Sequence, residues 1–326
     1  MRENKVIYGL IGYGGMGRWH TEILSNVPEI EIGGIYDIKE EKRIEAKEKG
    51  FSVYGSEEEM LSDPDIDVVL IATPNDCHKP IAIRAMHAGK NVISEKPVTL
   101  SSSDLQEMEN VAKETGKFLT VHQNRRWDDD FLIIRKLVEE QKLGHVFRIE
   151  SRVHGSRGIP GDWRKEKIHG GGMVLDWGVH LLDQILYLYG DRKIETVYAS
   201  LTHITNQEVD DGFTTILTFE GGTEVLVEVG TNNYISLPRW YVLGEDGTAV
   251  IRDWQLNGEI IRKTGITEEK VVPVKTAAGL TKTMAPRRED TIVKEELPHV
   301  SGDIADFHRL SLIHISEPTR RTPISY

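Results

Sequence analysis

A strand, a glycine-rich turn and an acidic residue near the amino terminus constrain the fold of this chain most. Residues 5–11 form an aliphatic run that leads into Gly12-Tyr13-Gly14-Gly15-Met16-Gly17 and then into a helical pattern over residues 18–24. In such a G-x-G-x-x-G turn the first glycine permits the tight turn, the second lets a pyrophosphate approach, and the third packs the helix on the strand. The turn therefore predicts a dinucleotide-binding α/β unit.

Asp37 strengthens this interpretation. It ends a second predicted strand, residues 31–36, and lies about 20 residues beyond the turn, where a ribose-binding acid is expected. A carboxylate there accepts hydrogen bonds from a ribose 2′-hydroxyl and repels a 2′-phosphate, so we expect NAD rather than NADP. Asp37 could instead cap the helix predicted over residues 39–49, and the two roles are compatible.

The alternation of helices and strands continues up to residue 123. It is carried by a helix over 57–61, a strand over 67–72, a helix over 81–88, a strand over 91–94, a helix over 101–115 and a strand over 118–122. This order predicts a doubly wound parallel sheet with helices on both faces, in a domain of residues 1–123. Ligands of such sheets bind at the carboxyl ends of the strands. The cofactor-binding candidates there are Thr73, Pro74, Asn75, His78, Glu95 and Lys96.

A different periodicity begins after a predicted helix that ends near residue 141. From residue 146 the chain alternates with period two, and Gly-Gly, Asp-Gly and Asn-Gly turns separate several of the runs. These are hairpin signals, and they predict an α+β domain with a large, mainly antiparallel sheet over residues 124–311. One face of such a sheet needs a cover, so we expect a homodimer or homotetramer formed through it. We expect residues 276–300 to form a long loop or strand return and a short helix to begin near residue 301.

Residues 312–326 differ from the rest of the chain. They contain two prolines and lack an amphipathic pattern, and they resemble the translated read-through of a synthetic sequencing adapter. We interpret them as a non-native tail and expect the natural chain to end differently.

One apolar helix is predicted inside the sheet domain, over residues 173–189. It follows Gly170-Gly171-Gly172 and carries Asp176 and His180, which are four residues apart and so share one face. A carboxylate and an imidazole would then project together. The alternative is that His180 is a hydrogen-bonded core histidine. Asp183, on the same helix, is expected to be structural.

Composition excludes several classes of function. The net charge of −12 argues against a nucleic-acid partner. The single cysteine, Cys77, excludes an internal disulfide framework, and no signal segment opens the sequence, so a cytoplasmic location is expected. The apolar runs are too short to cross a membrane. The twelve histidines show no H-E-x-x-H spacing, and no metal is expected.

The order of these motifs resembles that of the Gfo/Idh/MocA family, named for glucose-fructose oxidoreductase and inositol dehydrogenase. The resemblance rests on the glycine turn, on Glu95-Lys96-Pro97, and on Asp176 and His180 behind the three glycines. It implies a Rossmann domain, a second domain with an antiparallel sheet, a nicotinamide cofactor and a sugar, cyclitol or related polyol as substrate. It also implies that Lys96, Asp176 and His180 are catalytic. His180 would then be the general base, Asp176 would orient the imidazole or bind the substrate hydroxyl, and Lys96 would hydrogen-bond the reacting oxygen.

Further substrate contacts are expected from two polar and aromatic segments, since sugar hydroxyls and C–H faces suit such side chains. The candidates are Asn124, Arg125, Arg126 and Trp127 after the last strand of the first domain, and Arg157, Asp162, Trp163 and Arg164 ahead of the apolar helix. The leading hypothesis is an NAD-dependent oxidoreductase acting on a secondary alcohol of a sugar, glycoside or cyclitol. Two alternatives stay open: an NAD-dependent glycosidase that oxidises its substrate transiently and eliminates the aglycone, and a catalytically inactive protein that senses a sugar or nucleotide.

Overall fold

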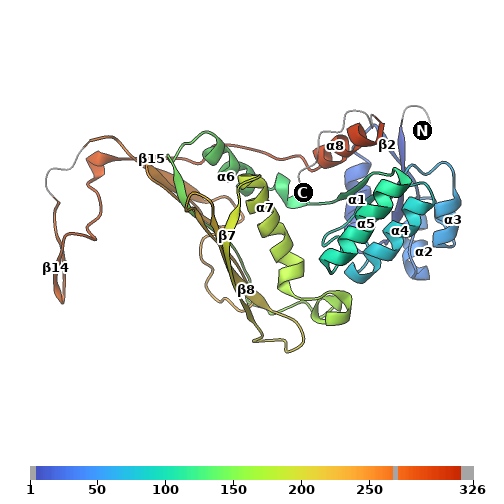
Figure 1. The fold of residues 1–326 in the computed structure, drawn as a ribbon, viewed down its shortest axis with the longest axis horizontal. Coiled ribbons are helices and arrows are strands. Elements are labelled where there is room, and N and C mark those ends of the chain that lie inside the picture. The colour runs from blue at the N-terminus through green and yellow to red at the C-terminus, as the bar shows by residue number, and fades with distance from the viewer. Residues whose placement is uncertain (1–4, 267–270, 317–326) are drawn as a thin grey trace.

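The computed structural model describes residues 5–266 and 271–316, which form two domains lying side by side (Figure 1). The first domain holds a small sheet between helices, and the second holds a large sheet with helices on one face. Within the described residues, no helix combines the length and the apolar character that a membrane span requires.

The first domain is a five-stranded, fully parallel sheet in the order β2-β1-β3-β4-β5. Its strands are β1 (Val6–Ile11), β2 (Ile30–Tyr36), β3 (Val68–Ile71), β4 (Asn91–Ser94) and β5 (Leu119–Val121). The connecting helices are α1 (Gly15–Leu24), α2 (Glu40–Glu48), α3 (Glu57–Ser62), α4 (His78–His87) and α5 (Ser102–Thr115), with a short 3-10 turn, η1 (Asn75–Cys77), before α4. A single parallel bridge between Ile35 and Val53 extends the sheet beyond β2. The doubly wound fold predicted from the sequence is confirmed.

The strand β1 shows why this sheet needs helices on both faces. All six of its residues are buried, and successive side chains of a strand point to opposite faces. Val6, Tyr8 and Leu10 accordingly join one apolar cluster, whereas Ile7 and Ile11 join another on the opposite face. Burial on both faces explains the unbroken aliphatic run in the sequence.

The second domain is built on an eight-stranded sheet in the order β15-β12-β11-β10-β6-β9-β8-β7. Its strands are β6 (Val146–His154), β7 (Ile194–Thr202), β8 (Gly212–Phe219), β9 (Glu224–Gly230), β10 (Trp240–Gly244), β11 (Gly247–Ile251), β12 (Gly258–Lys263) and β15 (Ile292–Glu295). Only the β6–β9 pair is parallel, so the expected mainly antiparallel sheet is confirmed.

The segment expected as a loop or strand return between residues 276 and 300 does contain a strand. It supplies the edge strand β15, preceded by the 3-10 turn η6 (Glu289–Thr291). Ahead of this turn a two-stranded hairpin of β13 (Val274–Thr276) and β14 (Gly279–Thr281) extends away from the body of the domain (Figure 1).

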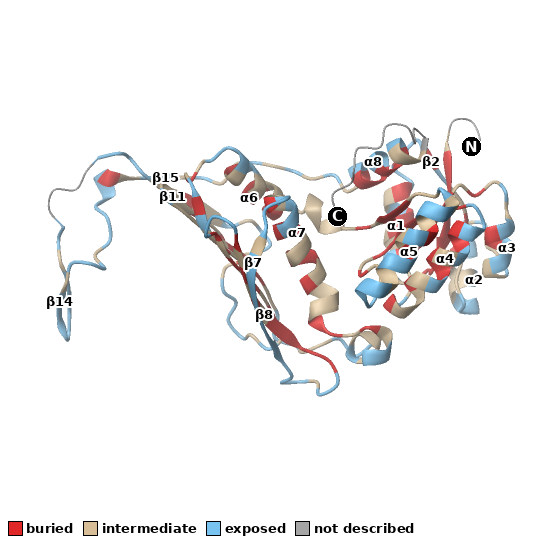
Figure 2. Cartoon of the chain, viewed as in Figure 1, coloured by how far each residue is buried: buried red, intermediate tan, exposed pale blue. Residues whose placement is uncertain are grey.

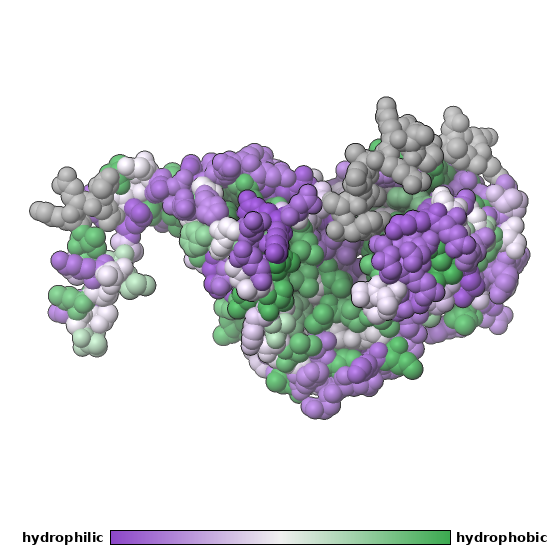
Figure 3. Space-filling view, in the orientation of Figure 1, coloured by the Kyte–Doolittle hydropathy of each residue, from purple (hydrophilic) through white to green (hydrophobic). Residues whose placement is uncertain are grey.

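Two helices cover one face of the large sheet, α6 (Asp129–Glu139) and α7 (Val179–Tyr189). Ile133, Leu181 and Ile185 of these helices pack in one core cluster with β-strand residues such as Val225 and Trp240. Figure 2 shows buried stretches both in these two helices and in the strands of the large sheet. In Figure 3 hydrophobic residues gather over α7, between the polar surfaces of α5 and α6.

The predicted apolar helix is present, but its first turn is not α-helical. Residues Val174–Gly178 form a π-helical turn, η5, that runs directly into α7. Single π turns inside helices occur frequently at functional sites. Gly178 within this turn is buried against the ring of Phe213, 2.9 Å from where a Cβ would lie, so close packing requires a glycine here.

The last described helix, α8 (Ala305–Ser316), follows the second domain in the chain but packs on the first. Ala305, Phe307 and Leu312 join the apolar cluster on one face of the parallel sheet. The expected division had placed residues up to 311 in the second domain. Of the predicted tail, residues 312–316 continue α8, and residues 317–326 lie outside the described part of the chain.

Candidate active site between the two domains

The glycine turn has the shape that a dinucleotide requires. Gly12 adopts φ +98°, and a Cβ there would lie 2.4 Å from the Ala72 carbonyl oxygen; a Cβ at Gly17 would lie 2.1 Å from the Gly12 carbonyl oxygen. Both positions exclude any side chain. A Cβ on Gly14 or Gly15 would meet no described atom within 4 Å. The backbone is thus open on one side, at the start of α1, which is where a pyrophosphate binds in this kind of turn.

Asp37 connects the glycine turn to the end of β2. Its carboxylate accepts hydrogen bonds from the backbone N–H groups of Tyr13 at 2.7 Å and Lys39 at 2.9 Å. The N-cap residue of α2 is Lys39 rather than Asp37, so Asp37 is not the cap that the alternative interpretation required. The half-buried carboxylate is held beside the turn, where a ribose would lie.

Two of the predicted cofactor residues are engaged with the protein itself. The ring nitrogens of His78 contact the carbonyl oxygens of Pro97 at 2.7 Å and Thr73 at 3.0 Å, which ties the ends of β3 and β4 together. Asn75 donates from Nδ2 to the Gly170 carbonyl oxygen at 2.9 Å and so joins the two domains. In this structure His78 therefore positions strand ends, and Asn75 holds the two domains together. Pro74 is exposed and Thr73 half-buried at the same edge.

Glu95, which was also predicted to bind the cofactor, is engaged inside the first domain instead. Its Oε1 lies 2.8 Å from His20 Nε2 and 3.0 Å from His122 Nδ1, inside the first domain, and its Oε2 accepts from the Lys96 backbone N–H at 3.2 Å. Burial by itself would raise the pKa of Glu95, but the adjacent His122 and His20 hold the pKa well below its usual range. Glu95 is thus an ionised, buried carboxylate that fixes the backbone before Lys96. A direct cofactor contact by this side chain does not follow from the structure.

Lys96 reaches from the first domain into the second. Its ammonium donates to the backbone carbonyl oxygen of Asp176 at 2.8 Å and to the carboxylate Oδ1 of Asp176 at 3.1 Å. The same oxygen lies 3.3 Å from Nε of Arg164. Burial would raise the pKa of Asp176, and the two cations overcome this and lower it. The structure thus brings together Lys96 and Asp176, which are far apart in the sequence, as expected.

His180 lies one turn beyond Asp176 and is 5% exposed. Burial, together with the positive charges of Lys96 and Arg125, lowers the pKa of His180 well below its usual range, so the imidazole is neutral at pH 7. Its Nδ1 is buried and finds no hydrogen-bond partner among the residues that the structure describes. A satisfied core histidine would have such a partner. The bonding of His180 therefore favours the functional interpretation.

The predicted substrate contacts in the segment η2 (Asn124–Trp127) fall into two groups. Arg126 forms a bidentate ion pair with Asp183 of α7, at 2.7 and 2.6 Å, and its guanidinium lies 4.6 Å above the Tyr187 ring. Trp127 packs against Phe307 of α8, with ring centroids 5.9 Å apart. Both side chains thus have structural partners, which the polar and aromatic pattern of the sequence did not reveal. Asp183 is structural, as expected.

Arg125 and Asn124 are placed differently. Arg125 stacks over the rings of Trp177 at 4.2 Å and Trp254 at 5.6 Å, and Trp177 lies 5.9 Å from the His180 ring. Buried polar atoms without a partner in the described ranges gather along this segment and α7, namely Gln123 Oε1, Asn124 Oδ1, Arg125 Nε and Gln184 Oε1. A pocket of about 320 Å³ opens beside Arg125, lined by Trp127, Trp254, Leu256, Asp128, Asp129 and Asp130. Unsatisfied donors and acceptors next to an apolar ring are what a polyol can use.

Trp163 and Arg164, predicted substrate contacts ahead of η5, lie in a turn beside Asp176. Arg164, in the 3-10 turn η3 (Trp163–Lys165), bonds Asp162 at 2.8 Å as well as approaching Asp176, and its guanidinium lies 4.6 Å above the Trp163 ring. The following turn, η4 (Lys167–His169), contacts the first domain through His169, 3.2 Å from Asp76. Trp254 was not predicted for this site, because it comes from a distant β11–β12 connection and nothing in the local sequence marks it.

The chain matches two family models, one for each domain. Residues 6–123 match the model described as the Gfo/Idh/MocA oxidoreductase family, NAD-binding Rossmann fold, and residues 131–250 match the Gfo/Idh/MocA C-terminal domain. Among solved structures, an NAD-binding protein from Listeria innocua is 48% identical, with a TM-score of 0.92 over 99% of this chain and 92% of that one.

Curated relatives match over shorter segments. The uncharacterised oxidoreductase YdgJ of Escherichia coli is 37% identical over 58% of this chain and 55% of its own length. The scyllo-inositol 2-dehydrogenase (NADP(+)) IolW of Bacillus subtilis is 30% identical over 74% of this chain and 67% of its own length. The agreement of both domain models, the fold and these relatives shows that the chain is a member of the Gfo/Idh/MocA family of oxidoreductases.

Proposed function

We propose that this chain is an NAD-dependent dehydrogenase that oxidises a secondary alcohol of a sugar, glycoside or cyclitol. The observation that carries the proposal is the meeting of Lys96 and Asp176 across the two domains, beside a neutral, buried His180 with an unpartnered nitrogen. The cofactor turn and this triad come from different domains, and Lys96 follows the strand β4 at the carboxyl edge of the parallel sheet, where cofactors of such sheets bind.

The residues divide the work of binding and proton transfer. When bound, the nicotinamide would accept the hydride that leaves the substrate carbon. His180 is neutral and has a free acceptor position once its tautomer is set, so it can take the hydroxyl proton. Lys96 is held by Asp176 and can donate a hydrogen bond to the substrate oxygen, which stabilises the negative charge that develops there. Asp176 keeps Lys96 and Arg164 oriented.

The choice of NAD rests on Asp37. Its carboxylate is fixed by backbone N–H groups at the end of β2, where it favours a ribose 2′-hydroxyl and repels a 2′-phosphate. The relative IolW is named as an NADP(+) enzyme, so the cofactor is a point on which members of the family differ. Arg43 of α2 donates hydrogen bonds to the carbonyl oxygens of Asp37 and Ile38.

We base the proposed substrate class on polar and aromatic groups near the candidate catalytic residues. Arg164, Arg125 and Asn124 offer charged or polar atoms. The indole rings of Trp177, Trp254 and Trp163 lie beside them, each with a guanidinium group over the ring. The relative IolW is named for scyllo-inositol, which is a polyol with this combination of hydroxyls and C–H faces. We therefore place cyclitols and pyranoses first among the substrates to be tested.

The test is turnover with a panel of cyclitols, sugars and glycosides, with NAD and NADP, followed at the absorbance band of the reduced nicotinamide. We expect reduction of NAD by at least one cyclitol or sugar. His180→Ala should lower kcat/KM about 10²–10⁴-fold while leaving the Kd for NAD unchanged. His145→Gln, at an exposed histidine that follows α6 in the chain, is the matched control and should keep full activity. Full activity of His180→Ala, or aglycone release without any reduced cofactor, would contradict the proposal.

We further propose that the chain forms a homodimer or homotetramer through the open face of the large sheet. Helices cover the other face (Figure 1). Cross-strand pairing places Tyr198, Ile216, Leu226, Tyr241 and Val250 in one row on the open face, interrupted on β6 by Glu150, which pairs with both Leu226 and Tyr241. Tyr198 is 60% exposed. Light scattering should show an oligomer for this chain and a smaller species for Leu226→Lys; a wild-type monomer at micromolar concentration would refute this assembly.

A further inference from the structure

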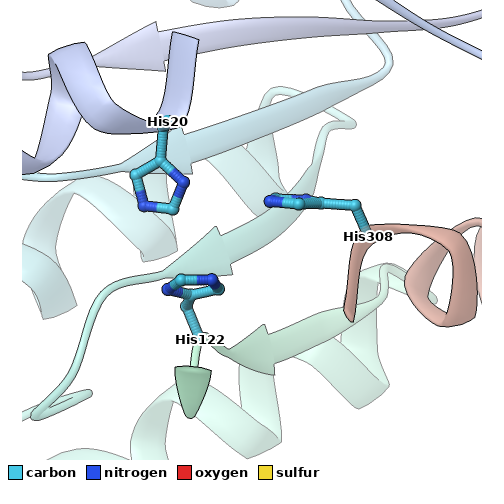
Figure 4. Close-up of side chains that lie close together, drawn as sticks. All are labelled: His20, His122 and His308. Carbon is cyan, nitrogen blue, oxygen red and sulfur yellow. The ribbon is translucent and has the colours of Figure 1, made fainter. Parts of the chain in front are cut away.

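Three buried histidines meet inside the first domain, and none of them is among the proposed catalytic residues. His20 comes from α1, His122 follows β5, and His308 comes from α8 (Figure 4). All three have no exposed surface. Their ring centroids lie 4.6 to 5.9 Å apart, and one nitrogen from each ring lies within 4.8 Å of the other two. The fold thus collects three imidazoles from opposite ends of the chain.

Glu95 determines the tautomer of two of these rings. Its Oε1 contacts both His20 Nε2 and His122 Nδ1, and an ionised carboxylate can only accept hydrogen bonds. Both rings therefore donate N–H groups to Glu95. In their neutral form the opposite nitrogens, His20 Nδ1 and His122 Nε2, carry free lone pairs. A carboxylate that orients histidines from behind in this way is typical of metal sites.

The inner nitrogens have nothing to bind in the protein. His20 Nδ1, His122 Nε2 and both nitrogens of His308 are buried and lack a hydrogen-bond partner within residues 5–266 and 271–316. Each such atom destabilises the fold when it is left unsatisfied. A purely structural polar cluster would be expected to pair these atoms, as Glu95 pairs the outer ones. Their convergence on a shared space is the arrangement that a cation with nitrogen ligands needs.

We propose that His20, His122 and His308 form a binding site for one transition-metal ion, with Zn²⁺ preferred, outside the proposed catalytic site. Imidazole nitrogen suits Zn²⁺ and related first-row ions, whereas Mg²⁺ and Ca²⁺ require oxygen ligands. At Zn–N distances of about 2.0–2.1 Å a tetrahedral ion separates its ligand nitrogens by about 3.3 Å. The three nitrogens, within 4.8 Å of one another, reach this spacing by side-chain shifts of about 1 Å.

We assign the ion a structural role; with three histidine ligands, a water would fill the fourth tetrahedral position. Its ligands stand on α1, after β5 and on α8, so the ion joins α8, which follows the second domain in the chain, to the sheet of the first. It also fixes Glu95, whose other oxygen accepts from the backbone of Lys96. Metal loading should therefore stabilise the first domain and hold the segment before Lys96.

The experiment uses the full chain without a histidine tag, stripped with a chelator and titrated with Zn²⁺ by calorimetry. We expect one tight ion per chain, a higher melting temperature with Zn²⁺, and visible absorption of a tetrahedral site with Co²⁺. His308→Phe should weaken Zn²⁺ binding roughly 100-fold or more, because the phenyl ring fills the space beside Tyr8 and Phe307 without offering a ligand. His145→Gln should bind as the wild type does.

A second variant covers the case in which His308→Phe fails to fold. His308→Cys keeps a ligand at this position, so it should retain the ion and add a sulfur-to-cobalt charge-transfer band with Co²⁺. The proposal is overturned if the stripped wild type has no tight site, if a folded His308→Phe binds Zn²⁺ unchanged, or if His308→Cys binds Co²⁺ tightly without a sulfur-to-cobalt band.

Discussion

The ion pair between Arg126 and Asp183 gives the sharpest test of which polar residues near the site are structural. The guanidinium binds the carboxylate through two nitrogens, at 2.7 and 2.6 Å, and the side chains are only 17% and 15% exposed. Arg126→Ala would leave the Asp183 carboxylate half-buried without a partner. Removing one member of a buried pair lowers the free energy of unfolding by about 3–5 kcal/mol. Because this pair is partly exposed, we expect a loss of about 3 kcal/mol, which includes the loss of the stacking on Tyr187.

The assay is urea unfolding, followed by circular dichroism and tryptophan fluorescence, combined with a double-mutant cycle. Asp183→Ala alone should destabilise the second domain to a similar degree. The pair Arg126→Met with Asp183→Leu should recover most of the stability, because it removes both charges together. Arg135→Ala is the matched control: Arg135 also lies over the Tyr187 ring, at 5.3 Å, but its ion pair with Glu139 is on the surface. It should cost about 0.5 kcal/mol or less.

Kinetics distinguish this structural role from the substrate contact that the sequence suggested. Arg126→Ala should change KM little at temperatures where it remains folded. If the variant keeps wild-type stability and raises KM strongly instead, Arg126 binds substrate and the ion pair is incidental. Equal stability of the Asp183→Ala variant and the wild type would refute the reasoning in the same way.

The other predictions concern the cofactor turn and the buried histidines. Asp37→Ser should raise the Kd for NAD and lower that for NADP, measured by fluorescence titration, and an unchanged preference would show that Asp37 does not read the ribose. Gly12→Ala should cost at least about 1–3 kcal/mol in thermal or urea unfolding, since the residue has φ +98° and a Cβ would meet the Ala72 carbonyl; wild-type stability would count against this geometry. Burial lowers the pKa of His20, His180 and His308 below the ordinary value of 6.5. At a pH below 6.5 the unfolded chain then binds more protons than the folded chain, so the free energy of unfolding is highest above about pH 6.5 and declines as the pH falls below it. Stability of the metal-free protein that does not change from pH 7 to 5 would refute this.

Much of the fold was predictable because its signals are local. Fully buried strands appear as aliphatic runs, half-buried strands alternate with period two, and glycines mark the turns, so the parallel sheet and the mainly antiparallel sheet were both expected. The glycine turn and Asp37 were found in the same way, since the cofactor site of a Rossmann unit is built from one contiguous strand, turn and helix.

The candidate catalytic residues were found in part from local sequence and in part from resemblance. Asp176 and His180 share one helix, so their proximity could be predicted from spacing. Lys96 could be placed only at the carboxyl edge of a sheet; its ion pair with Asp176 depends on how the two domains pack. The π turn that carries Asp176 was not predicted, because an additional residue in a helical turn leaves no periodic signal in a short segment.

What the sequence by itself determined is the identity of the elements and the chemistry available at their ends. What the tertiary structure decided is which of these groups are already occupied: Arg126 by Asp183, His78 by two backbone carbonyls, and Glu95 by two histidines. The physical reason is that hydrogen bonds and ion pairs between distant segments form only after the chain folds. The same packing brings together His20, His122 and His308 from separate elements, a cluster that no local spacing could reveal.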